Sequence, residues 1–118
     1  MEIRASVPYV RVADVHASLA FHRALGYEVE EKLSDDHGVF WAALRNGAAR
    51  VMLSNRPVHD AEQLTWLYVD DVEAAYSEII RAGLSPLGPP RDQEHGTREF
   101  LVADSSGILY VVATPIEG

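Results

Sequence analysis

The chain has 118 residues, 47% of them hydrophobic and 24% charged, which indicates one folded domain rather than a disordered or fibrous protein. It contains no cysteine, which excludes disulfides, thiolate metal ligands and cysteine nucleophiles and fits a cytoplasmic protein. The net charge is −8, so we expect no nucleic-acid partner. No apolar run approaches the roughly 20 residues of a membrane span, so we expect no membrane partner.

The first half of the chain predicts a strand, a helix and three further strands. The expected ranges are a strand at 7–12, a helix at 14–25, and strands at 27–33, 37–45 and 49–54. Asn46 and Gly47 form a strong hairpin signal between the last two strands. The second half repeats this order. Its expected ranges are a strand at 64–69, a helix at 71–82, a short strand at 84–87, and strands at 98–103 and 109–113.

The two halves share residues at equivalent places, which indicates an internal duplication. Asp14 aligns with Asp71, and Gly26 aligns with Gly83. An Asp at the start of a helix accepts hydrogen bonds from free backbone N–H groups, and a Gly after the helix ends it in a left-handed conformation. We therefore interpret residues 1–118 as a single domain of two repeats, at about 4–55 and 64–114, joined by a linker at about 56–63.

The predicted fold class is α+β, with two tandem βαβββ modules that form a curved mixed sheet around a cleft and carry their helices on the outer face. Side chains alternate along a strand, so each sheet has one side under its helix and one open side. This alternation assigns Val10 and Leu67 to the helix side and Tyr9 and Trp66 to the open side. Two modules set side by side would enclose the cleft between their open sides.

Three segments resemble the vicinal oxygen chelate superfamily, which groups glyoxalase I, extradiol dioxygenases, fosfomycin-modifying enzymes and bleomycin resistance proteins. They are 12–27 (VADVHASLAFHRALGY), 67–76 (LYVDDVEAAY) and 95–107 (HGTREFLVADSSG). The resemblance covers nearly the whole chain and includes the duplication. In the final turn, Ser105 stands where a Pro is more usual, and His22 stands where a Tyr is common after Phe.

The resemblance also implies where a metal would bind. Metal-binding members have a His ahead of each helix-opening Asp, a Glu in the fourth strand and another Glu after the final turn. Those positions hold Val7, Leu64, Val51 and Val111 here. None of these side chains has the nitrogen or oxygen donor that a divalent metal needs, and a shift by one residue at Val51 finds Arg50 or Met52. We therefore expect no metal and no other cofactor.

Aromatic and aliphatic residues on the open sides, with a few polar groups, predict a pocket for a small molecule. The residues expected to bind the ligand are Tyr9, Arg11, Phe40, Leu53, Trp66, Tyr68, Arg98 and Val111. Arg11 stands where some glyoxalases place an arginine that contacts the anionic end of the substrate, and a surface ion pair is the other interpretation of this residue. Core packing or a dimer interface are the other interpretations of the apolar residues.

Polar residues outside this set leave further alternatives open. His37 follows Asp35 and Asp36 at an expected turn, where loop chemistry is favoured over weak metal binding. His95 and Glu99, with Arg98, provide groups for an acid, a base or an anion clamp, provided that they point into the pocket. No catalytic residue is assigned.

Together these observations favour a non-enzymatic, antibiotic-resistance-like protein that sequesters an amphipathic or cationic small molecule, acts as a homodimer and lies in the cytoplasm. The alternative is a metal-dependent lyase, isomerase or dioxygenase with an atypical metal site around His37, His95 and Glu99. A third interpretation is a partner-binding module that uses the acidic surface.

Overall fold

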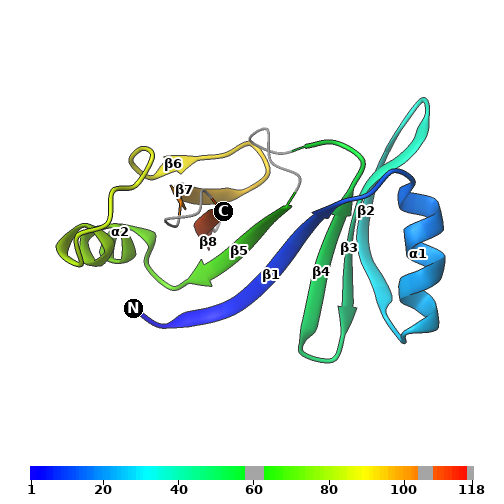
Figure 1. The fold of residues 1–118 in the computed structure, drawn as a ribbon, viewed down its shortest axis with the longest axis horizontal. Helices are drawn as coiled ribbons and strands as arrows, with labels where there is room; N and C mark the ends of the chain where they lie inside the picture. The colour runs from blue at the N-terminus through cyan, green and yellow to red at the C-terminus, as the bar shows by residue number, and fades with distance from the viewer. Residues whose placement is uncertain (58–62, 104–107, 117–118) are drawn as a thin grey trace. The chain divides into compact units, whose positions relative to one another are not determined.

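The computed structural model describes residues 1–57, 63–103 and 108–116 of the chain. The chain divides into two compact units, one comprising Val7–Leu64 and the other comprising Met1–Ser6 with Thr65–Gly118 (Figure 1). Each unit is described by itself below. No helix among the described residues is both long enough and apolar enough to cross a membrane.

In the unit Val7–Leu64, one helix packs against a mixed sheet. Its elements are β1 (Ile3–Arg11), α1 (Val15–Ala24), β2 (Glu28–Asp35), β3 (Gly38–Asn46) and β4 (Ala49–Ser54). The strand order is β2-β3-β4-β1, in which β1 runs parallel to β4 and the other neighbours are antiparallel. Between α1 and this sheet lies a cluster of buried apolar residues: Val15, Leu19, Ala42, Leu44, Val51 and Leu53.

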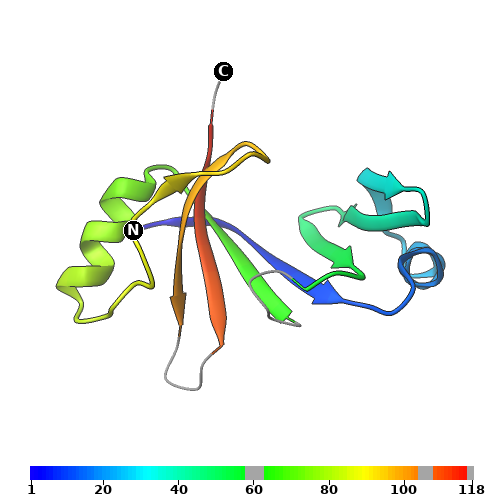
Figure 2. The same cartoon turned by 90° about the horizontal axis from the view of Figure 1, so that it is seen from above.

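The second unit has the same succession of a strand, a helix and three strands. Its elements are β5 (Gln63–Val69), α2 (Val72–Arg81), β6 (Arg91–Asp92), β7 (Thr97–Ala103) and β8 (Leu109–Pro115). β5 runs parallel to β8, and the pairs β8–β7 and β7–β6 are antiparallel, with α2 along one face of the sheet (Figure 2). The core between α2 and this sheet consists of Val69, Val72, Ala75, Ile79, Phe100 and Val112.

The two helices begin and end in the same way, as the duplication predicts. Asp14 caps α1 by accepting from the backbone N–H of Ala17, and Asp71 caps α2 by accepting from two backbone N–H groups. Gly26 and Gly83 follow the helices with φ angles of +94° and +89°. Such angles strain a residue that carries a Cβ, so glycine ends both helices in the left-handed conformation.

The predicted α+β class and the order of elements are confirmed, whereas the short strand expected at 84–87 is wrong. Pro86 has no N–H to donate to a strand ladder, and the strand that precedes β7 is instead the two-residue β6. The turn predicted at 104–107 and most of the linker lie outside the described residues. The cleft and the boundaries of the repeats stay predictions.

Candidate functional site

The sheet of the second unit has a face on the side away from α2, which we call the open face because it lies opposite the helix. Four of its residues are nevertheless buried: Trp66, Val111, Ala113 and Glu99. Leu67, Phe100 and Val112 pack against α2, so the residues next to them along each strand point the other way. Strand pairing sets these residues in two rows across β5, β8 and β7. One row holds Trp66, Val111 and Leu101, and the other holds Tyr68, Ala113 and Glu99. These six residues define the open face.

A buried carboxylate lies in this open face. Glu99 is only 6% exposed, and it shares its row with Tyr68 across the strand that carries Ala113. The side chain of Ala113 ends at Cβ, so it leaves room between the phenol and the carboxylate. Burial raises the pKa of Tyr68, and the charge of Glu99 raises it further. The Tyr68 hydroxyl therefore stays protonated at neutral pH and can donate a hydrogen bond.

His95 joins this group from the turn before β7. Its Nε2 lies 2.9 Å from Thr97 Oγ1 and 3.3 Å from Glu99 Oε1. Its ring meets the Trp66 ring edge to face, with centroids 6.3 Å apart. The side chain of His95 is 54% exposed and that of Glu99 is 6% exposed, so the imidazole is the solvent-facing partner of a buried carboxylate.

The structure thus brings together five residues that the sequence had singled out separately. Trp66, Tyr68 and Val111 were expected to bind a ligand. His95 and Glu99 were candidates for an acid, a base or an anion clamp, provided that they point into the pocket. Ala113 and Thr97 were missed. Ala113 could have been predicted, because it is two residues after Val111 on β8 and therefore lies on the same side of the strand. Thr97 could not, because its contact with His95 depends on the conformation of a turn.

Leu53 requires a correction, because the sequence placed it on the open side and the structure places it under α1. It is 1% exposed and belongs to the core cluster of Val15 and Leu19. Pairing of the parallel strands sets Leu53 beside Val10 and Met52 beside Tyr9, so Met52 is the residue of β4 on the open side. Alternation shows which residues of a strand share a side, but it does not show which side meets the helix. For this reason the predicted sides of β4 were shifted by one residue, from Met52 to Leu53.

Two of the other expected ligand-binding residues of the first unit, Tyr9 and Phe40, lie near Arg56. Burial raises the pKa of Tyr9, against the opposing effects of a hydrogen bond with Ser54 and the charge of Arg56. The Arg56 guanidinium carbon lies 3.8 Å from the centroid of the Phe40 ring, a cation–π contact. Arg11 is exposed at the end of β1. The role of Tyr9, Phe40 and Arg11 in binding stays a prediction.

Arg98 does not join His95 and Glu99. Its Nε donates to Glu73 Oε1 at 2.5 Å, and its Nη1 donates to Asp92 Oδ1 at 3.0 Å. Glu73 lies at the start of α2, so Arg98 points toward the helix side while its neighbour Glu99 points to the open face. Arg98 is thus paired with Glu73 and Asp92 rather than with His95 and Glu99, and its expected role in binding a ligand stays a prediction.

His37 lies in the turn between β2 and β3. Its backbone N–H donates to Asp35 Oδ1 at 2.7 Å, which is the turn chemistry that the sequence favours. His37 belongs to the unit Val7–Leu64, whereas His95 and Glu99 belong to the other unit.

The positions of the superfamily's metal ligands do not fit a metal here. Val7, Leu64 and Val111 are buried and have no donor atom. After the corrected register on β4, the fourth position holds Met52, whose thioether is a poor ligand for hard divalent cations. Within residues 1–57, 63–103 and 108–116, no three His, Asp or Glu side chains gather as a metal site would require.

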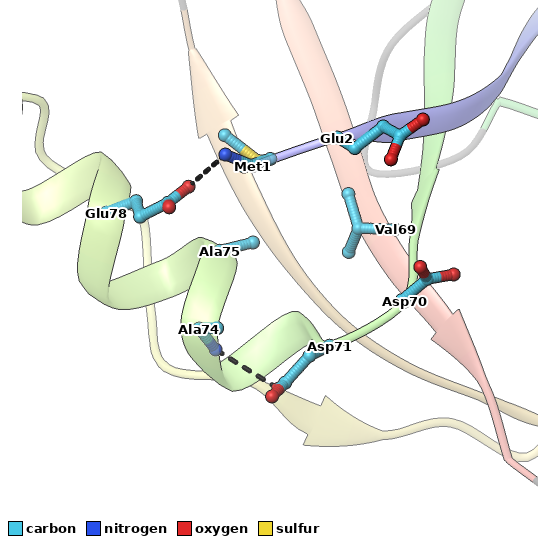
Figure 3. A pocket seen from close by; sticks show the side chains of 8 residues that line it. All are labelled: Met1, Glu2, Val69, Asp70, Asp71, Ala74, Ala75 and Glu78. Carbon is cyan, nitrogen blue, oxygen red and sulfur yellow. Dashed lines mark hydrogen bonds and ion pairs between the residues drawn. The ribbon is translucent and has the colours of Figure 1, made fainter.

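A hollow lies between the first residues of the chain and α2, and carboxylates line it (Figure 3). Each of three carboxylates has a structural partner. Asp71 caps α2, Glu78 pairs with the terminal amine of Met1 at 2.7 Å, and Asp70 pairs with Arg4 at 2.8 Å. These contacts tie the first residues of the chain to α2 and account for the acidic lining.

Comparison with known proteins identifies the family. The family model described as Glyoxalase/Bleomycin resistance protein/Dioxygenase superfamily matches residues 5–112. No curated protein sequence matches the chain.

Solved structures resemble the chain over nearly its whole length. A superfamily member from Vibrio splendidus 12B01 is 20% identical over 98% of this chain and 100% of that chain, with a TM-score of 0.69. A hypothetical protein from Bacillus halodurans C-125 is 15% identical over 100% and 98%, with a TM-score of 0.77. Methylmalonyl-CoA epimerase from Mycobacterium tuberculosis is 16% identical over 98% and 88%, with a TM-score of 0.68.

At these identities the structural likeness shows the fold alone, whereas the family model covers most of the chain. The chain belongs to the glyoxalase/bleomycin resistance protein/dioxygenase superfamily.

Proposed function

We propose that this domain binds a small amphipathic molecule with a positively charged group on the open face, without a metal ion, and holds it unchanged. An antibiotic with a cationic group is one ligand of this class. The observation that carries the proposal is the buried carboxylate of Glu99 in a face that also holds Trp66 and Tyr68.

A cation gains two kinds of attraction on such a face. The carboxylate of Glu99 attracts it directly, and the π-electrons of an aromatic ring add about 0.5–2 kcal/mol when the cation lies over the ring. Val111 and Ala113 are fully buried and form the apolar base of this face. The net charge of −8 raises the local concentration of cations around the protein.

The donor set supports binding without a metal. The positions at which metal-binding members of the superfamily hold His and Glu carry aliphatic side chains and one thioether in this chain. A ligand would therefore be held by its charge and its apolar surface rather than by coordination.

The test is a titration with benzyltrimethylammonium, an aromatic quaternary ammonium ion, followed by tryptophan fluorescence. Trp41 lies in the other unit, so the variant Trp41→Phe leaves Trp66 as the reporter on the open face. We expect the cation to change the fluorescence of Trp66, and its neutral carbon isostere to bind more weakly.

Glu99→Gln keeps the shape of the side chain and removes its charge. A hydrogen bond or contact with a charged group contributes about 1.5–3 kcal/mol, so this variant should bind the cation about ten- to a hundredfold more weakly. Glu94→Gln, at an exposed position in the turn before β7, changes the net charge equally and is the matched control. Equal affinity in the wild type, Glu99→Gln and Glu94→Gln would refute the proposed role of the open face.

A metal-dependent enzyme is the second candidate, and the contact between His95 and Glu99 favours it by bringing two possible ligands together. It requires further donors beyond these two. Elemental analysis after dialysis against nickel, zinc, manganese and iron salts separates the candidates, because the enzyme requires about one tightly held ion per chain whereas the proposed binding protein retains none.

We further propose that the domain is a homodimer in the cytoplasm, as the sequence suggested. Sedimentation equilibrium measures the assembly, and a mass of 13.0 kDa at all concentrations would exclude the dimer. Fractionation of the source cells tests the location.

A further inference from the structure

His95 contacts two of the side chains that would hold a bound cation on the open face, Glu99 and Trp66. Its Nε2 lies 3.3 Å from the carboxylate of Glu99, and its ring meets Trp66 edge to face at a centroid distance of 6.3 Å. A third contact, 2.9 Å from Nε2 to Thr97 Oγ1, holds the imidazole over this place. We propose that His95 is a built-in competitor that occupies the cation site until a ligand displaces it.

This inference rests on the proposed function and adds its regulation. A ligand must displace the imidazole from Glu99 and Trp66 before it can contact these two side chains itself. Breaking the contacts of His95 costs free energy, so the competitor lowers the apparent affinity of the ligand.

The position of His95 makes displacement feasible. Its side chain is 54% exposed and extends from a turn between β6 and β7, so it can swing outward without disturbing the core between α2 and the sheet. Gly96 follows it with a φ of +96°, which shapes the turn independently of the imidazole.

The experiment is a calorimetric titration of benzyltrimethylammonium with the wild type and with His95→Gln under the same conditions. His95→Gln keeps a polar side chain but removes the imidazole that contacts Glu99 and Trp66. We expect it to bind about threefold or more tightly than the wild type, because the ligand no longer has to displace the ring.

His37→Gln, in the exposed turn between β2 and β3, removes a histidine elsewhere and should keep the affinity of the wild type. Equal or weaker binding by His95→Gln would overturn the competitor while leaving the proposed function standing. An equal gain of affinity in His37→Gln would also overturn it. No binding by any variant would overturn the proposed function and the competitor together.

Discussion

The corrected register of β4 makes a sharp prediction, because two adjacent residues should behave differently on truncation. Leu53 is 1% exposed and packs with Val15 and Leu19 under α1, so Leu53→Ala removes buried methyl groups and leaves a cavity. Such a change in a core costs about 3 kcal/mol. For a domain of this size, that loss lowers the melting temperature by about 10 °C. Met52 is half-buried on the other side, so Met52→Ala should cost about 1 kcal/mol.

Urea unfolding of both variants, followed by circular dichroism, measures the two free energies of unfolding. The comparison is internally controlled, because the two residues share a strand, a similar volume and the same replacement. An equal loss for both variants, or a larger loss for Met52→Ala, would refute the assignment of Leu53 to the helix side.

Three further predictions concern the caps, the buried phenol and the helix ends. Asp14→Ala and Asp71→Ala should each lower the free energy of unfolding by about 1 kcal/mol in urea titrations, because each leaves helix N–H groups without their acceptor. The raised pKa of Tyr68 means that its contribution to stability is complete below about pH 10 and is lost as the pH rises through its folded pKa. In spectroscopic titrations of tyrosinate absorbance, compared with Tyr68→Phe, the variant Glu99→Gln should shift that ionisation toward lower pH. Gly83→Ala should destabilise by about 1 kcal/mol in thermal unfolding, because φ there is +89°. Unchanged stability in the cap or glycine variants would contradict the described helix ends.

Local signals made the helices predictable from the sequence. Asp14 and Asp71 satisfy free N–H groups within the next three residues, and Gly26 and Gly83 relieve strain at their own positions. Neither effect depends on distant parts of the chain. The repeated pattern therefore predicted the order of elements.

The site was predictable only in part, because it depends on contacts between strands. Trp66, Tyr68 and Val111 follow from alternation along β5 and β8. The side on which Leu53 lies depends on how β4 pairs with β1, and the direction of Arg98 depends on Glu73 and Asp92, which no periodic pattern reveals. The approach of His95 to Glu99 likewise requires the turn between β6 and β7.

Whether the protein binds a cation without a metal ion is decided by the affinity of chelator-treated protein for benzyltrimethylammonium at pH 8.0, before and after divalent metal is added. We predict that metal-free protein binds the cation, that Glu99→Gln loses affinity, and that zinc, nickel, manganese or iron changes nothing. Binding that appears only with a stoichiometric metal ion would contradict the proposed function and favour a metal-dependent enzyme.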